Sequence, residues 1–184
     1  IEDGGALVLN QKCIRDWGIN LSHSRRTDST AKLVPEWAWI EQGDALINST
    51  GVGTLGRTAQ VGGVDEPTTV DSHITIVRPD PNLVDPGFFG VAIRSLEALF
   101  ISYSSGSTGQ SELSRSAIST ARLLLPPAAK QREIADLASS IDLLVAATDT
   151  ALSDACALRS GLLHGLLSGN HEIPESYNAL LEAS

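Results

Sequence analysis

The chain of 184 residues lacks methionine and has few cysteines and aromatic residues. Its two cysteines, Cys13 and Cys156, lie in unrelated segments, and no C-x-x-C or cysteine and histidine cluster has the spacing of a zinc site. This excludes a disulfide framework and favours a reducing cytoplasm. The four histidines, which share no helical face or metal-ligand spacing, are His23, His73, His164 and His171. We therefore predict no metal and no cofactor.

Long hydrophobic runs are also missing. The longest, such as "LVAATDTAL", are interrupted by Asp or Thr, so none approaches the roughly 20 apolar residues of a membrane helix. The first residue is Ile1, followed by Glu2 and Asp3, so neither an initiator methionine nor a signal peptide with a basic start is visible. We expect a soluble protein and interpret the chain as a fragment, or as one whose true start is missing.

Positive charge is scarce overall, since the net charge is -9. A protein with this balance does not hold nucleic acid by bulk electrostatics alone. The first 33 residues are nevertheless slightly basic, whereas residues 128–184 carry eight carboxylates and three basic groups. The N-terminal end could therefore meet phosphate and the C-terminal end could not.

The sequence from Ala6 to about Pro127 has a pattern typical of short strands. Gly-, Pro- and Asp-rich turns separate apolar or β-branched runs, and we predict strands in "ALVLN", "WAWIE", "DALINS", "HITIVRP" and "ARLLLP". One helix is predicted over residues 87–101, covering one side of the sheet, with one apolar face made by Phe89, Ile93, Leu96 and Phe100. The fold class is therefore α+β, with an irregular β-rich domain over residues 1–127.

A heptad pattern follows from Lys130 to about Leu167. Its apolar positions alternate in steps of three and four, and we call them the seam: Ile134, Leu137, Ile141, Leu144, Thr148, Ala151, Ala155, Leu158 and Leu162. Such a helix is roughly 50 Å long and needs a partner for its apolar stripe. The alternative is a helix that folds back on its own β-domain. Glycines at 165 and 169 end it, and a short helix is predicted at 177–182, so the second domain is 128–184.

The loop "STGVGTLGRT" contains a G-x-G-x-x-G at Gly51, Gly53 and Gly56. A dinucleotide site requires a helix directly after the glycines, but here "RTAQVGGVDEPTTV" follows, which has no helical stripe. We instead predict a tight hairpin or bulge in which the three glycines take positive φ.

Five motifs in order resemble those of one known family: "GDALINSTGVGTLGRTAQV", "TTVDSHITIVRPD", "GSTGQSELSRSAI", "LLLPPAAKQREIADLASSID" and "LRSGLLHGLLSGNHEIPESY". From about Asn10 to the C-terminus the chain resembles the target recognition domain and following helix of a type I restriction-modification DNA specificity subunit. The most distinctive motif is P-P-x-x-x-Q-x-x-I-A leading into the heptad helix.

This resemblance implies a non-catalytic protein that reads half of a bipartite target in double-stranded DNA. The long helix would pair with a second helix as a spacer and dock adenine methyltransferase subunits, and a motor and nuclease subunit would join for cleavage. A whole subunit has two recognition domains and two helices, whereas this chain has one of each, and the usual start upstream of "ALVLNQKC" is short or absent. The chain is then a C-terminal piece of a longer subunit, or a half-subunit that pairs with itself.

Three stretches supply side chains that suit base edges and phosphates. The candidate DNA-binding residues are Asn10, Gln11, Lys12, Arg15, His23, Arg25 and Arg26 in the first stretch, Ser49, Thr50, Thr54 and Arg57 in the glycine loop, and Ser105, Ser107, Thr108 and Gln110 in the third. For each arginine, a solvated or salt-bridged surface group is the alternative.

Two other functions compete with DNA recognition. Intrinsic methyl transfer is disfavoured because the chain has no βαβ repeat and no catalytic loop of the N-P-P-F/Y type. Asp71, Ser72 and His73 are adjacent in sequence and do not form a hydrolytic relay. The second alternative is a protein-interaction module, in which the β-domain binds a peptide and the helix only dimerises.

Overall fold

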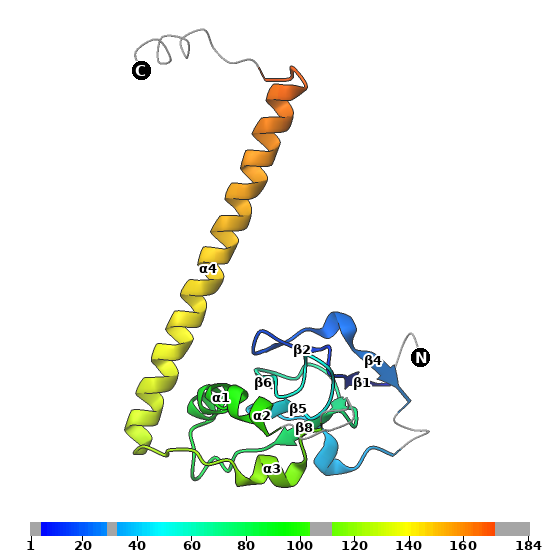
Figure 1. The fold of residues 1–184 in the computed structure, drawn as a ribbon, viewed down its shortest axis with the longest axis vertical. Helices are drawn as coiled ribbons and strands as arrows, with labels where there is room; N and C mark the ends of the chain where they lie inside the picture. The colour runs from blue at the N-terminus through cyan, green and yellow to red at the C-terminus, as the bar shows by residue number, and fades with distance from the viewer. Residues whose placement is uncertain (1–4, 29–32, 104–111, 172–184) are drawn as a thin grey trace. The chain divides into compact units, whose positions relative to one another are not determined.

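The computed structural model describes residues 5–28, 33–103 and 112–171 of the chain (Figure 1). The residues form two compact units, 1–136 and 137–184. Three expectations from the sequence lie outside the described residues: the start of the chain, the third candidate stretch (Ser105, Ser107, Thr108 and Gln110) and the short helix at 177–182.

The first sheet of the N-terminal unit has three strands. Its central strand β1 (Ala6–Leu9) pairs in antiparallel with β4 (Arg25–Thr27) and in parallel with β7 (Thr68–Val70). Between β1 and β4 the chain makes a small hairpin of β2 (Ile14–Arg15) and β3 (Gly18–Ile19). The hairpin is followed by a single 3-10 turn, η1, at residues 21–23.

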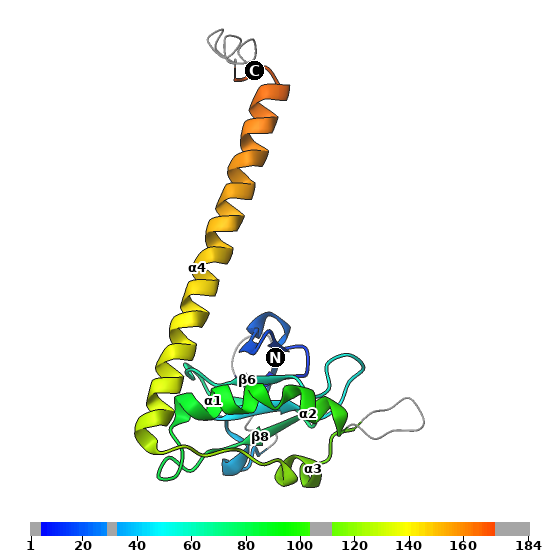
Figure 2. The same cartoon turned by 60° about the vertical axis from the view of Figure 1, so that its left-hand side comes forward.

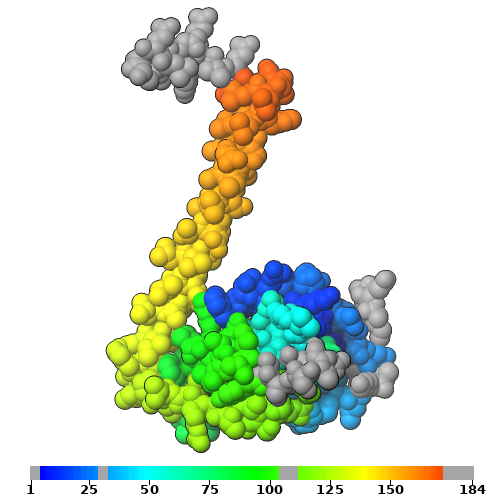
Figure 3. All heavy atoms as spheres, in the orientation of Figure 1, coloured from blue at the N-terminus to red at the C-terminus, as the bar shows by residue number. Residues whose placement is uncertain are grey.

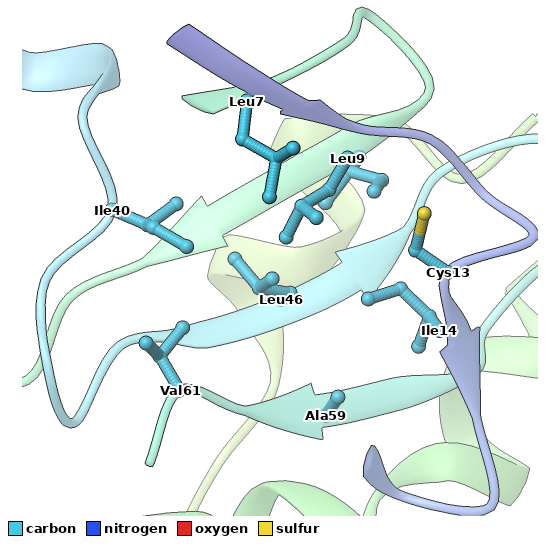
Figure 4. Packing of buried hydrophobic residues seen from close by; sticks show 9 residues of the cluster. Leu7, Leu9, Cys13, Ile14, Ile40, Leu46, Ala59 and Val61 are labelled. Carbon is cyan, nitrogen blue, oxygen red and sulfur yellow. The ribbon is translucent and has the colours of Figure 1, made fainter. Parts of the chain in front are cut away.

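The second sheet is wholly antiparallel. Its central strand β5 (Ala45–Asn48) is buried along its whole length, because it lies between β6 (Thr58–Gln60) and β8 (Ile74–Val77). Apolar side chains of both sheets and of the small hairpin form one core: Leu7, Leu9, Cys13, Ile14, Ile40, Leu46, Ala59 and Val61 (Figure 4). Burial raises the pKa of the Cys13 thiol, which fits a packing role.

Two consecutive helices cover the other side of the second sheet (Figure 2). Helix α1 (Pro86–Ser95) begins with a proline and with Asp85 as its cap, whose carboxylate accepts a hydrogen bond from the Phe88 amide at 3.0 Å. Helix α2 (Glu97–Ser102) follows after an interruption at Leu96. The apolar stripe predicted over 87–101 does face the core, but the single helix expected there is broken in two.

Two predicted strands are wrong. In "WAWIE", Glu36–Ala38 is a 3-10 turn, η2, and only Trp39 makes an isolated bridge, to Thr69, because Pro35 directs the chain into a turn. "ARLLLP" is an extended segment after α3 (Arg115–Thr120), and among the described residues it pairs with no strand. An apolar run becomes a strand only where a sheet edge is available to it.

The long helix is confirmed as α4 (Ala128–Leu167), which has 40 residues. Its first two turns belong to the N-terminal unit, where the buried Gln131 side chain accepts from the Asp85 amide and donates to the Pro126 carbonyl, both at 2.8 Å. The glutamine of the P-P-x-x-x-Q motif thus joins the start of α4 to the loop before α1.

The apolar side chains of α4 are exposed within the described part of this single chain. Leu137 is 63% exposed, Leu144 68% and Leu158 65%. An isolated water-exposed helix does not gain stability from such residues, so the stripe is suited to pairing with another helix. The helix ends at Leu167, and Gly169 has a φ of 72°.

Candidate nucleic-acid interface

The glycine loop connects β5 to β6 as a hairpin, so no helix follows the glycines. The φ angles of Gly51, Gly53 and Gly56 are 110°, 74° and 81°, which confirms the predicted positive values. Gly56 is also required for space, because a Cβ there would lie 2.9 Å from the Ile101 backbone nitrogen. The loop geometry is therefore that of a tight hairpin, and the dinucleotide alternative fails as predicted.

Hydrogen bonds at the base of the loop hold it in one conformation. The buried Asn48 amide group donates to the Gln11 carbonyl at 2.9 Å and to the Thr54 carbonyl at 3.1 Å. The backbone amides of Leu55 and Gly56 donate to the carbonyls of Gly51 and Asn48 at 3.0 Å and 2.9 Å. This makes the loop a preorganised element rather than a loose connection.

The loop also contacts the first candidate stretch and residues 112–113. From the first stretch, the Gln11 side-chain carbonyl accepts a long hydrogen bond from the Thr50 hydroxyl, at 3.5 Å. Beyond the third stretch in sequence, the Leu113 amide donates to the Ser49 carbonyl at 2.8 Å, and Thr50 forms an isolated bridge with Glu112. Figure 3 shows the cyan atoms of this part of the chain at the surface, between the blue N-terminal segment and the green helices.

Sequence reasoning missed His73, which lies beside the same loop. Its Nδ1 is 2.7 Å from the Thr50 hydroxyl oxygen, and the residue is exposed. The backbone amide of His73 donates to the Asp71 carboxylate at 2.9 Å. The pairing of β5 with β8 places His73, the residue before β8, opposite Ser49, and Thr50 is the next residue along the chain. The contact therefore follows from the long-range pairing of these two strands.

Two polar residues among the candidates have structural partners. The Asn10 side-chain Oδ1 accepts from the Lys12 amide at 2.9 Å, and the side-chain amide group donates to the His23 carbonyl, so Asn10 shapes the turn after β1. The Ser49 side chain is buried and hydrogen-bonds to Thr75. Lys12, Arg15 and His23 are exposed, and Arg15 contacts Asp16 at 3.6 Å.

The two adjacent arginines of β4 have different surroundings. Arg26 forms a bidentate ion pair with Glu66, at 2.6 and 3.0 Å, and this hydrogen bonding lowers the pKa of the Glu66 carboxyl below its usual value. Arg25 is exposed and lies opposite Val8 of β1. In the glycine loop, Arg57 is partly exposed, and no ion pair joins it to another described residue.

The described residues contain neither a metal-binding cluster nor a helix that could span a membrane. Among residues 5–28, 33–103 and 112–171, no group of three or more histidine, cysteine or acidic side chains could hold a metal ion. None of the helices in these ranges is apolar enough, over a sufficient length, to cross a membrane.

Comparison with known proteins identifies the fold. The crystal structure of the HsdS subunit from Thermoanaerobacter tengcongensis superposes on 92% of this chain with a TM-score of 0.63 and 15% sequence identity. The chain has the fold of part of an HsdS subunit. It covers 44% of the length of that subunit. HsdS subunits are the specificity subunits of type I restriction-modification systems, so the resemblance inferred from the five motifs is confirmed at the level of the fold.

A second structure gives the same result. It was solved in a study of complex assembly and conformational transition of the type I restriction-modification system, and it matches with a TM-score of 0.60 and 16% identity, over 92% of this chain and 44% of its own. No family model and no curated protein matches the sequence. The chain therefore spans less than half the length of the structures that share its fold.

Proposed function

We propose that the chain is a non-catalytic DNA-recognition module of a type I restriction-modification complex, reading one half of a bipartite target. The observation that carries the proposal is the shared fold with HsdS subunits over 92% of the chain. The recognition surface is the glycine loop with Gln11, Thr50, Arg57 and His73 around it, flanked by the exposed basic residues of the first stretch.

The chemistry of this surface fits base reading better than bulk attraction. Glutamine, threonine and histidine side chains present donors and acceptors to base edges, whereas arginine and lysine hold phosphates. The clamped hairpin positions these groups before DNA arrives, which lowers the entropy cost of binding. A net charge of -9 means that a partner must supply much of the electrostatic grip.

We propose that methyltransferase subunits are the partners that supply this electrostatic attraction to DNA. These subunits, and not this chain, then methylate adenine. A motor and nuclease subunit joins where cleavage follows. The exposed stripe of α4 pairs with a second helix, either in a longer chain or in a second copy, and so sets the distance between two recognition domains. If two copies pair, the helices run antiparallel and the DNA target is symmetric. Such a complex works in the cytoplasm.

Selection from a pool of random DNA duplexes tests the proposal. We expect the full chain, combined with methyltransferase subunits of a type I system from the same genome, to enrich one sequence motif that the methyltransferase alone does not enrich. The Arg57→Ala variant should retain less DNA at equal concentration. Arg122→Ala, which alters an exposed arginine outside both α4 and the glycine loop, is the matched control and should behave as wild type. An unenriched pool with the wild-type chain would contradict the proposal and favour the peptide-binding module.

A further inference from the structure

The outermost side chain of the glycine loop is apolar. Val52 is 93% exposed, although every other large aliphatic residue of the β5–β6 hairpin is buried. Single exposed apolar residues are common on protein surfaces and carry no meaning by themselves. Val52 differs because of how the backbone beneath it is held.

Three sets of contacts fix the backbone on both sides of Val52. Before it, the Ser49 amide donates to the His73 carbonyl at 2.8 Å, and the Thr50 hydroxyl contacts His73. After it, Leu55 is buried in the core and Gly56 lies against the backbone of Ile101. Across the loop, the amides of Thr54 and Leu55 both donate to the Gly51 carbonyl. Val52 is therefore carried on an ordered support that does not have to be organised on binding.

The residues that flank Val52 leave it sterically accessible. Gly51 and Gly53 have no side chains, and around Gly53 no atom lies within 4 Å of the position that a Cβ would occupy. Because the residues before and after it have no side chains, Val52 can enter a DNA groove without a steric clash from positions 51 and 53. The two glycines thus serve access as well as the turn itself.

Valine has no hydrogen-bonding group, and this limits what it can read in DNA. In the major groove the thymine C5-methyl group is the apolar feature of the base edges, and aliphatic side chains discriminate by contact with it. We propose that Val52 is a specificity-determining residue that contacts the methyl group of one thymine in the target. This rests on the proposed function, because it requires that the glycine loop faces DNA.

The neighbours of Val52 supply the polar part of the same contact. The Gln11 side chain lies directly beside Gly51. A Cβ built at Gly51 would be only 2.3 Å from the Gln11 side-chain oxygen. Glutamine pairs with adenine through two hydrogen bonds, and adenine is the partner of thymine. An apolar tip next to an amide therefore suits an A·T pair, or adjacent pairs, within the half-target.

The test combines a base change with a side-chain change. In the motif selected by the wild-type chain with its methyltransferase, each thymine is replaced in turn by deoxyuridine, which lacks only the methyl group. We expect one replacement to weaken binding about fourfold, the effect of losing one buried methyl-sized group. For Val52→Ala, whose side chain is shorter by two methyl groups, the same replacement should have a smaller effect, while the other thymines behave as in wild type.

Controls separate this contact from folding and from general apolar exposure. Val52→Ala should keep the circular dichroism spectrum and melting temperature of wild type, because the Val52 side chain is 93% exposed. Leu124→Ala removes another aliphatic residue that is 93% exposed, outside the loop, and should leave the deoxyuridine profile unchanged. A wild-type profile in Val52→Ala, or a selected motif without thymine, overturns the role of Val52 and leaves the proposed function intact. If the wild-type chain selects no motif, the proposed function itself fails.

Discussion

Single residues in the candidate surface differ most in whether other residues of the protein already bind their side chains. Arg25 and Arg26 are adjacent in sequence and equally basic, but alternation along β4 turns them to opposite faces. Arg26 is occupied by Glu66, whereas Arg25 is exposed. From charge alone, both arginines are predicted to bind DNA. Only the long-range ion pair between Arg26 and Glu66 shows that their surroundings differ.

The Arg25→Ala variant should bind DNA more weakly than wild type, with little change in stability. If Arg25 contacts a phosphate, the slope of log affinity against log salt concentration falls by about one unit. Retention of duplex DNA at several salt concentrations measures this. An unchanged slope would remove Arg25 from the site.

The Arg26→Ala variant should instead lower the melting temperature at neutral pH. The lowered pKa of Glu66 means that the ion pair stabilises the fold above the usual glutamate pKa, and that this contribution is lost as the pH falls through the folded-state pKa. Thermal melts of the variant and wild type should therefore converge as the pH falls below the usual glutamate pKa and through its lowered value in the fold. A difference that persists unchanged in acid would contradict the assigned role of the pair.

In the glycine loop, backbone conformation and steric space both limit which residues can replace glycine. Gly53 and Gly56 both have positive φ, but open space surrounds the first and the Ile101 backbone lies against the second. A side chain at either position strains the backbone, and only at Gly56 does it also meet atoms that cannot move aside.

Gly53→Ala should therefore cost about 1 kcal/mol of folding free energy, which is the cost of a left-handed conformation for a residue with a Cβ. Gly56→Ala should cost about 3 kcal/mol, since a steric clash adds to that strain. Urea unfolding followed by circular dichroism compares the two. Equal losses would mean that the close approach to Ile101 does not constrain the loop.

Local patterns predict the elements whose cause is local. The positive φ of the three glycines and the course of α4 follow from turn chemistry and a heptad repeat, so both are readable from the sequence. "WAWIE" and "ARLLLP" have strand composition, but whether an edge is available to them depends on distant segments. The contact of His73 with Thr50 likewise depends on β5 and β8, which are joined through a long connection.

For the molecule as a whole, the proposed spacing of two recognition domains requires that the exposed stripe of α4 has a partner. Leu144→Asp combined with Ala151→Asp places two charges on the seam and should abolish helix pairing while the β-rich domain keeps its fold. Leu143→Asp is the matched control, because Leu143 is 70% exposed and points away from the seam on the helical wheel. Sedimentation velocity measures the assembly, and equal behaviour of the seam variant and wild type would exclude this pairing face.

The central claim is that this chain chooses the DNA sequence on which a complex acts. Genome-wide mapping of methylated adenines, in cells that carry the methyltransferase subunits with or without this chain, tests that claim most directly. We predict a bipartite methylated motif that is present only with the chain and that changes when the glycine loop is replaced. A methylation pattern that is the same in the presence and absence of the chain would contradict it.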